Sequence, residues 1–217
     1  MHLNSELLIR KYALPYFKDN IRVLEIGPSG VPSAYQKVVN NNSIVWHTLD
    51  IAATYQNITY VATEDYCYPV ESESYDLIIS GQVIEHVKKI WLWMTELKRI
   101  LRQGGTMIIV NPISWPYHAF PVDCWRIFPD GMRALCDHVD LQIELSEFES
   151  IEAEHFVGTY TPTAPGQSYT FLDLRKRILL IKFWNTLIHV IPIVNKLKVP
   201  VEVAYDTITI VTKIKEK

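Results

Sequence analysis

The sequence predicts an α/β fold, with a parallel sheet that carries helices on both faces. Between Val23 and Val110, short apolar runs alternate with amphipathic stretches, and the turns that join them are short. This alternation is typical of a doubly wound sheet, in which each crossover helix returns the chain to the next parallel strand. The first apolar run, residues 22–26, stops at Gly27-Pro-Ser-Gly30, and such a glycine turn lets a nucleotide-like ligand approach the backbone.

Gly27 and Gly30 form an incomplete version of the GxGxxG dinucleotide motif, so an ordinary tight turn is the alternative interpretation. The second apolar run, residues 44–49, delivers Asp50 to its carboxyl end, 20 residues beyond Gly30. A nucleotide-binding sheet places an acid near this offset, and a carboxylate accepts hydrogen bonds from both hydroxyls of a ribose. We therefore expect Asp50 to hold a ribose, with a solvated turn acid as the alternative.

Length and composition suit one soluble domain over residues 1–217. A net charge of −3 gives no general attraction to nucleic acid, so we expect no nucleic-acid partner. The three cysteines, Cys67, Cys124 and Cys136, lack CxxC spacing and predict free buried thiols, and we expect no metal site. The first residues do not resemble a signal peptide, and no run reaches the length of a membrane span, so we expect a cytoplasmic protein.

Hydrophobic periodicity and turn residues predict the remaining elements. Residues 1–20 carry a leading amphipathic helix, expected over residues 5–17 with Ser5 as its N-cap. The helix that begins near Ile90 is expected to close at Gly104-Gly105. The expected strands are residues 22–26, 44–49, 57–62, 75–80, 106–110, 141–148 and 206–214, and the other expected helices are residues 31–40 and 129–136.

Four segments in order resemble the class I S-adenosylmethionine-dependent methyltransferases of the methyltransferase-11 type: VLEIGPSG at 23–30, Asp50, YDLIISGQVIEHV at 75–87 and LKRILRQGGTMIIVNP at 97–112. The resemblance implies a Rossmann-like seven-stranded sheet in the order 3-2-1-4-5-7-6, with strand 7 antiparallel. It implies S-adenosylmethionine as cofactor, bound mainly by residues 21–112, with residues 113–217 on the substrate side. The cofactor residues that it implies are Glu25, Gly27, Pro28, Gly30, Asp50, Ile51, Glu64, Asp65, Gly81, Gln82 and His86.

The chain departs from this family at the end of the third strand. Many relatives carry Gly-Asp-Ala-Glu there, and the aspartate holds the adenine amino group. The matching residues here are Val61-Ala-Thr-Glu64, so that acid is absent. Glu64 or Asp65 is the expected replacement.

The loop after the fifth strand, residues 113–129, resembles a segment of some of these methyltransferases, several of them near sugar and surface-polysaccharide biosynthesis enzymes. His118 is the candidate general base, because an unperturbed imidazole takes a proton near neutral pH. Asp123 would either orient that imidazole or accept a hydrogen bond from a substrate hydroxyl. Arg126 suits a carboxylate or phosphate. The expected acceptor contacts are Trp115, Tyr117, Trp125 and Arg126. Alternatively, the aromatic side chains pack the loop onto the sheet and Arg126 pairs with Asp123.

A helical insertion, residues 168–198, is expected between the sixth and seventh strands. Residues 178–191 are apolar around most of a helix, so the helix 171–198 is expected to form a lid, a homodimer face or a contact with a membrane surface. The function expected for the whole chain is methyl transfer to a small polar acceptor, with oxygen favoured and a sugar or surface-polysaccharide precursor as the candidate. The alternatives are an NAD-dependent dehydrogenase and a non-catalytic cofactor-binding scaffold.

Overall fold

The computed structural model describes residues 3–53, 55–151, 179–180, 183 and 204–214. The chain divides into two compact units, Met1–Glu149 with Tyr205–Lys217, and Ser150–Ala204. In the second unit, Leu179, Leu180 and Phe183 have helical backbone. The rest of the predicted insertion, residues 168–198, lies outside the described residues. The prediction of one domain over residues 1–217 therefore stays a prediction. Among the described residues no helix is long and apolar enough to span a membrane.

The first unit contains a seven-stranded sheet in the order β3-β2-β1-β4-β5-β7-β6. The first five strands run parallel, and β7 is antiparallel to both β5 and β6, so the predicted order and direction are confirmed. The register pairs Ile26 of β1 with Leu49 of β2 and with Ser80 of β4, which brings the carboxyl ends of these strands together. The strands are β1 Arg22–Ile26, β2 Val45–Asp50, β3 Tyr60–Val61, β4 Tyr75–Gly81, β5 Leu101–Pro112, β6 Gln142–Glu149 and β7 Asp206–Thr212.

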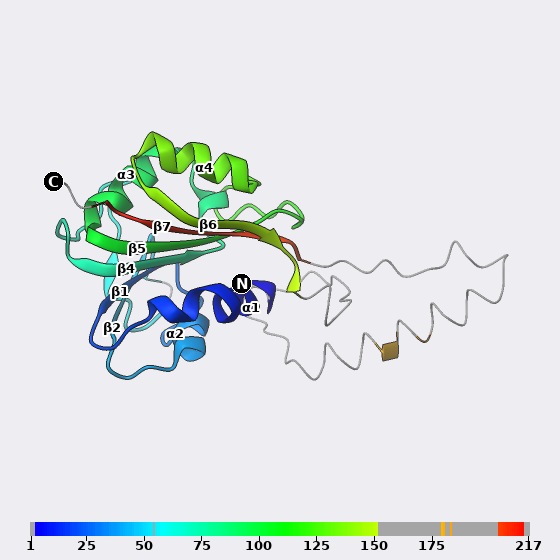
Figure 1. Cartoon of the computed structure of the whole chain (residues 1–217), viewed down its shortest axis with the longest axis horizontal. Coiled ribbons are helices and arrows are strands. Elements are labelled where there is room, and N and C mark those ends of the chain that lie inside the picture. The colour runs from blue at the N-terminus through cyan, green and yellow to red at the C-terminus, as the bar shows by residue number, and fades with distance from the viewer. Residues whose placement is uncertain (1–2, 54, 152–178, 181–182, 184–203, 215–217) are drawn as a thin grey trace. The chain divides into compact units, whose positions relative to one another are not determined.

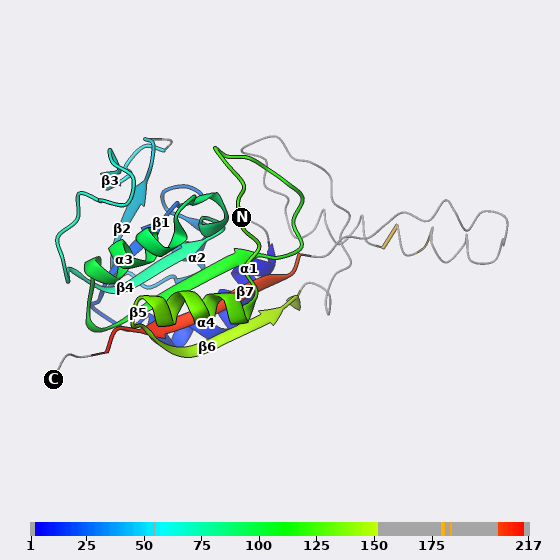
Figure 2. The same ribbon diagram turned by 90° about the horizontal axis from the view of Figure 1, so that it is seen from above.

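Helices cover both faces of the sheet (Figure 1). One face carries α3 (Ile90–Ile100) and α4 (Pro129–His138), and the other carries α1 (Leu3–Leu8) and α2 (Ala34–Val39). Seen from above in Figure 2, α4 lies over β6 and β7. The apolar face of α3 recurs at helical spacing, and its Trp93, Met94 and Leu97 are fully buried against the sheet. The carboxyl ends of β1, β2 and β4 lie side by side at one edge of the sheet.

The leading helix begins earlier than the sequence predicts. It runs through α1, a π-helical turn at Ile9–Ala13 and a 3₁₀ turn at Leu14–Tyr16. The expectation that Ser5 is the N-cap is wrong, because Ser5 lies inside α1 and is buried. Its hydroxyl accepts a hydrogen bond from the Gln82 side-chain amide at 2.9 Å. The Ser5 hydroxyl therefore makes a tertiary contact with the segment after β4, whereas the sequence pattern predicted that it would cap the backbone of the helix.

The expectation that Gly104-Gly105 closes α3 is also wrong. The helix ends at Ile100 and β5 starts at Leu101, which pairs with Tyr75 of β4. The register then shifts, and pairing resumes between Leu77 and Thr106, so the two glycines lie in an irregular stretch of β5. Gly104 has a φ of 75°, a backbone conformation that favours glycine. The two glycines therefore mark an irregularity within a strand rather than the end of a helix.

The three cysteines are free, as predicted, but their burial differs from the prediction. Cys136 of α4 is buried, whereas Cys67 and Cys124 are exposed. Both exposed thiols lie outside helices and named strands, where the surface position of loops keeps many side chains exposed.

Candidate active site

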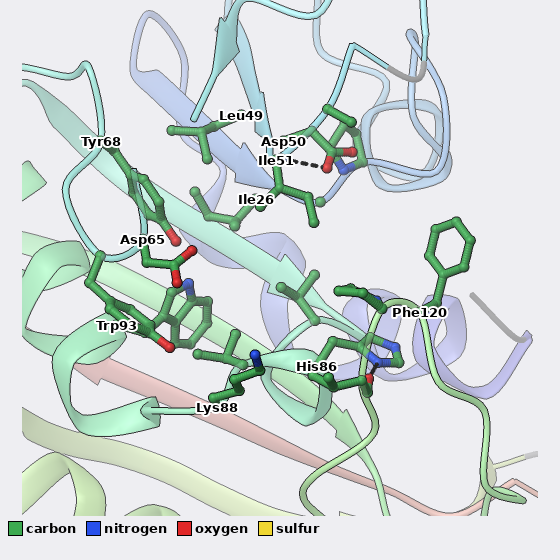
Figure 3. Close-up of a pocket in the computed structure, with 18 of the residues that line it drawn as sticks. Ile26, Leu49, Asp50, Ile51, Asp65, Tyr68, His86, Lys88, Trp93 and Phe120 are labelled. Atoms are coloured by element: carbon green, nitrogen blue, oxygen red, sulfur yellow. Dashed lines mark hydrogen bonds between the residues drawn. The ribbon is translucent and has the colours of Figure 1, made fainter. Parts of the chain in front are cut away.

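A cavity of about 560 Å³ opens at the carboxyl ends of β1, β2 and β4. In Figure 3, Asp50 and Ile51 lie on one side of it, Tyr68 and Trp93 on another, and His86 and Phe120 on a third. Its walls are mostly apolar or aromatic, and a few charged or polar groups lie among them. Such a composition is typical of a site for a small molecule. The position is the one at which a doubly wound sheet binds its ligand.

Two glycines are required by the packing around this cavity. Gly27 ends β1 with a φ of 65°, and a Cβ added there would lie 2.4 Å from Cγ2 of Val83. Gly81 ends β4, and its added Cβ would lie 1.8 Å from the Tyr35 hydroxyl. Contacts this short do not occur between real side chains, so a larger residue at either position would displace its neighbour. Glycine at these two positions therefore allows Val83 and Tyr35 to pack directly against the backbone at the ends of β1 and β4.

Eight of the eleven predicted cofactor residues line the cavity. The three that do not are Glu25, Gly30 and Gly81. The side chain of Glu25 is buried, and one of its carboxylate oxygens accepts hydrogen bonds from the Ser33 hydroxyl and the Trp46 indole. Glu25 thus ties β1 to β2 and to the start of α2. The eight lining residues are Gly27, Pro28, Asp50, Ile51, Glu64, Asp65, Gln82 and His86.

Asp50 stands at the carboxyl end of β2, as the sequence predicts. Its Oδ1 accepts a hydrogen bond from the backbone N–H of Ile51 at 2.7 Å, and this contact orients the carboxylate at the cavity wall. Burial raises the pKa of Asp50, while backbone hydrogen bonds from Ile51 and Ala52 oppose that rise. A fixed, half-buried acceptor of this kind suits a vicinal pair of hydroxyls.

Gln82 lines the cavity, but its side-chain amide is engaged elsewhere. Its Nε2 donates to the Ser5 hydroxyl at 2.9 Å and to the Asp206 carboxylate at 3.1 Å. Asn4 also donates to Asp206, at 2.8 Å, so these side chains join α1, β7 and the segment after β4. This buried network fixes the segment that leads into the 3₁₀ turn Ile84–His86.

The loop after β5 is folded around an ion pair. Asp123, 2% exposed, accepts from both terminal nitrogens of Arg126 at 2.5 and 2.8 Å. Arg126 also donates to the backbone carbonyls of Trp115 and Pro116. The Arg126 guanidinium lowers the pKa of Asp123 to about 2. None of the predicted acceptor residues lines the cavity: Trp115, Tyr117, His118, Asp123, Trp125 and Arg126 all lie outside it, and this loop contributes Phe120, Pro121 and Val122 instead.

Three hydrogen bonds fasten this loop to the 3₁₀ turn after β4. The backbone N–H of Cys124 donates to the Glu85 carbonyl at 2.7 Å, and the Trp125 indole donates to the Val87 carbonyl at 2.7 Å. The third joins Nδ1 of His86 to the Val122 carbonyl at 2.5 Å. Trp125 is therefore a packing residue of the loop in this structure.

Glu85, His86 and His118 come together at this junction. One nitrogen of each imidazole and one Glu85 oxygen lie within 4.8 Å of one another, and the two imidazole rings meet edge to face. Glu85 is fully buried, and burial raises its pKa to about 8. Burial also lowers the pKa of His86, which favours its neutral form. Of these three residues His86 lines the cavity, so the cluster adjoins its wall.

Comparison with known families matches just under half of the chain. Residues 11–109 match the model of a family described as a methyltransferase domain. The chain carries a class I S-adenosylmethionine-dependent methyltransferase domain. Its cofactor is S-adenosylmethionine, as the resemblance implied, and the dehydrogenase alternative finds no support. Comparison with curated proteins finds no match.

Solved structures share the fold of this methyltransferase. A SAM-dependent methyltransferase from Archaeoglobus fulgidus is 14% identical, with 96% of this chain and 93% of that one covered and a TM-score of 0.56. Phosphoethanolamine N-methyltransferase 2 from Haemonchus contortus, in complex with S-adenosyl-L-methionine, is 15% identical, with 98% and 53% covered and a TM-score of 0.58. The [4+2]-cyclase SpnF is 11% identical, with 97% and 80% covered and a TM-score of 0.60. At these identities the likeness shows the fold alone.

The cavity fits the cofactor of a methyltransferase. Gly27 and Pro28 bring the backbone after β1 to the cavity wall, and aromatic side chains provide flat apolar walls. Sequence reasoning missed some of those walls: Tyr68, Trp93 and the backbone turn Phe120–Val122. Trp93 fitted the apolar face of α3, so its pattern indicated core packing. Tyr68 lies in an aromatic, acidic loop whose composition was the available signal.

Proposed function

We propose that this methyltransferase transfers the methyl group of S-adenosylmethionine to an oxygen atom of a small polar acceptor, a hydroxyl of a sugar or of another polysaccharide precursor. The observation that carries the proposal is the cavity itself. It places the Asp50 carboxylate and the glycine turn on one side, and His86 with the loop Phe120–Val122 on another. One side suits the adenosyl group and the other suits an acceptor.

The cofactor side assigns a role to each group by its chemistry. Asp50 would accept hydrogen bonds from the two ribose hydroxyls, because its carboxylate is fixed by the Ile51 N–H and faces the cavity. Tyr68 would pack against the adenine or along the methionine chain. Glu64 and Asp65 lie at the same wall and are the acids available for the adenine amino group.

The acceptor side favours an oxygen nucleophile. Methyl transfer from a sulfonium is an in-line displacement, so holding the acceptor oxygen in line with the methyl group supplies much of the rate. A hydroxyl must also lose its proton. His118 is the candidate base, because its ring meets that of the cavity residue His86 edge to face and its Nδ1 is engaged with the Pro116 carbonyl at 2.9 Å. The other ring nitrogen, Nε2, then carries the lone pair. Asp123 would act as a positioning residue, through its hydrogen bond from the His118 backbone N–H at 2.8 Å.

Binding calorimetry on the native chain and on Asp50→Ala tests the cofactor side. We expect S-adenosylmethionine and S-adenosylhomocysteine to bind, NAD not to bind, and Asp50→Ala to weaken both adenosyl ligands about 10- to 100-fold, as the loss of hydrogen bonds to a charged group predicts. Asp130→Ala is the matched control, because Asp130 is a fully exposed acid of α4. A folded native chain that binds neither adenosyl ligand would contradict the proposal.

The same preparation then serves for a transfer assay with methyl-labelled S-adenosylmethionine and a panel of sugar, alcohol, amine and phosphoethanolamine acceptors. We expect label in a hydroxyl acceptor, and loss of transfer in His118→Ala with cofactor binding intact. His138→Ala is the matched control, since His138 is exposed on α4. Label in an amine alone would refute the oxygen assignment and leave the cofactor assignment standing.

A further inference from the structure

Glu85 is a buried acid to which the proposed mechanism gives no role. Its side chain is 0% exposed, and neither carboxylate oxygen has a hydrogen-bond partner on any other described residue. A buried carboxylate without a partner is costly, so such a group is expected to have a ligand. Nε2 of His86 lies 3.7 Å from Oε1. The third member of the cluster, His118, reaches the same place from the loop after β5.

The hydrogen bonds of the two histidines fix which ring nitrogen is free. Nδ1 of His86 contacts the Val122 carbonyl at 2.5 Å, and Nδ1 of His118 contacts the Pro116 carbonyl at 2.9 Å. A carbonyl oxygen can only accept, so Nδ1 carries the proton in both rings and Nε2 carries the lone pair. Metal-binding histidines are commonly held in this way, by a backbone carbonyl or a carboxylate on the far nitrogen. Asp123 adds a carboxylate at 3.4 Å from Nδ1 of His118.

We propose that Glu85, His86 and His118 bind a divalent metal ion of the zinc type. Two imidazole nitrogens and one carboxylate oxygen form a donor set found in catalytic zinc sites, which leave a further position open. Nitrogen donors do not suit magnesium or calcium. Zinc bonds of about 2.0–2.1 Å place tetrahedral donors roughly 3.3 Å apart. The ion would therefore draw the three donors closer together, and His118 has the most exposed side chain of the three, at 35%.

The open position of the ion would face the cavity, because His86 is both a ligand and a lining residue. This consequence rests on the proposed function: an acceptor hydroxyl bound there would lose its proton more readily. In the metal-bound form His118 would be a ligand, and the ion would take over the task assigned to a free imidazole. The site departs from the expectation of no metal site, because positions 85, 86 and 118 have no spacing that marks a ligand set.

Calorimetry with zinc chloride on the full chain, freed of metal by a chelator, tests the site. We expect one zinc ion per chain, and binding at least about 10- to 100-fold weaker in His118→Ala and in Glu85→Gln, since loss of a second-shell group alone costs that much. Glu85→Gln keeps the shape of the buried side chain, so this variant tests the site if His118→Ala does not fold. Magnesium chloride should show no binding. Cobalt(II) should give visible absorption typical of low coordination in the native chain, which both variants should lose.

Two controls separate this site from other ligands and from the proposed function. His138→Ala should bind zinc as the native chain does, and equal weakening in this variant would show adventitious binding through surface histidines. Binding of S-adenosylmethionine is measured in the same samples. Zinc binding without cofactor binding would sink the proposed function and leave the metal site; cofactor binding with no zinc binding, or with equal affinity in His118→Ala, would overturn the metal site alone.

Discussion

Glu25 should make the stability of the fold depend on pH, because the acid is buried in β1 with its side chain only 1% exposed. Burial raises its pKa from 4.5 to about 7, although hydrogen bonds from Ser33 and Trp46 oppose the rise. The higher folded-state pKa means that the folded chain holds this proton more tightly than the unfolded chain does. Its contribution to stability is therefore complete below pH 4.5 and is lost as pH rises through 7. A pKa difference of about 2.5, from 7 minus 4.5, corresponds to about 3 kcal/mol.

Glu25→Gln removes the charge and keeps an oxygen that can accept from Ser33 and Trp46. Urea unfolding followed by circular dichroism between pH 5 and 8 should show the variant gaining stability over the native chain, by about 2–3 kcal/mol across that range. Glu71→Gln is the control, because Glu71 is exposed, and its curve should stay parallel to the native one. A Glu25→Gln curve that also stays parallel to the native one would refute the argument that burial governs this carboxyl group.

Two further substitutions test packing around the site. Gly81→Ala should lower the free energy of unfolding by about 1–3 kcal/mol, because its Cβ would lie 1.8 Å from the buried Tyr35 hydroxyl; an unchanged thermal midpoint would argue against that contact. Asp123→Asn should cost about 1–3 kcal/mol, because it weakens the pair with Arg126, and should leave S-adenosylmethionine affinity unchanged, because Asp123 does not line the cavity. Weakened cofactor binding in folded Asp123→Asn, measured by calorimetry, would contradict that placement.

Much of the fold was predictable because its strands are continuous apolar runs. β1 spans the predicted residues 22–26, and the acid at the end of β2 is Asp50, as predicted. Errors arose where a distant partner overrides a local signal. The local sequence around Ser5 predicts an N-cap, but its hydroxyl binds the distant Gln82. The two glycines of β5 predict a helix end, but pairing with β4 makes that segment a strand.

The acceptor side was harder to predict than the cofactor side. Aromatic and charged residues between 113 and 128 indicated a functional loop, but its internal ion pair turns Trp115 and Arg126 away from the cavity. The residues that do reach the cavity, Phe120–Val122, lie in the same loop but were not among the expected acceptor contacts. The cluster of Glu85 with His118 depends on the path of a whole loop, which local periodicity does not contain. The predicted dimer or membrane-surface contact of residues 171–198 stays a prediction.

The position of β7 sets the order in which the sheet can be completed during synthesis. β7 lies between β5 and β6 and pairs with both, yet residues 150–205 must leave the ribosome before it appears. Until then the nascent chain exposes an unpaired edge of β5, and β6 has no neighbouring strand. Open edges of this kind recruit strands from other chains. Expression yield should therefore depend on chaperone capacity and on translation speed across residues 150–205.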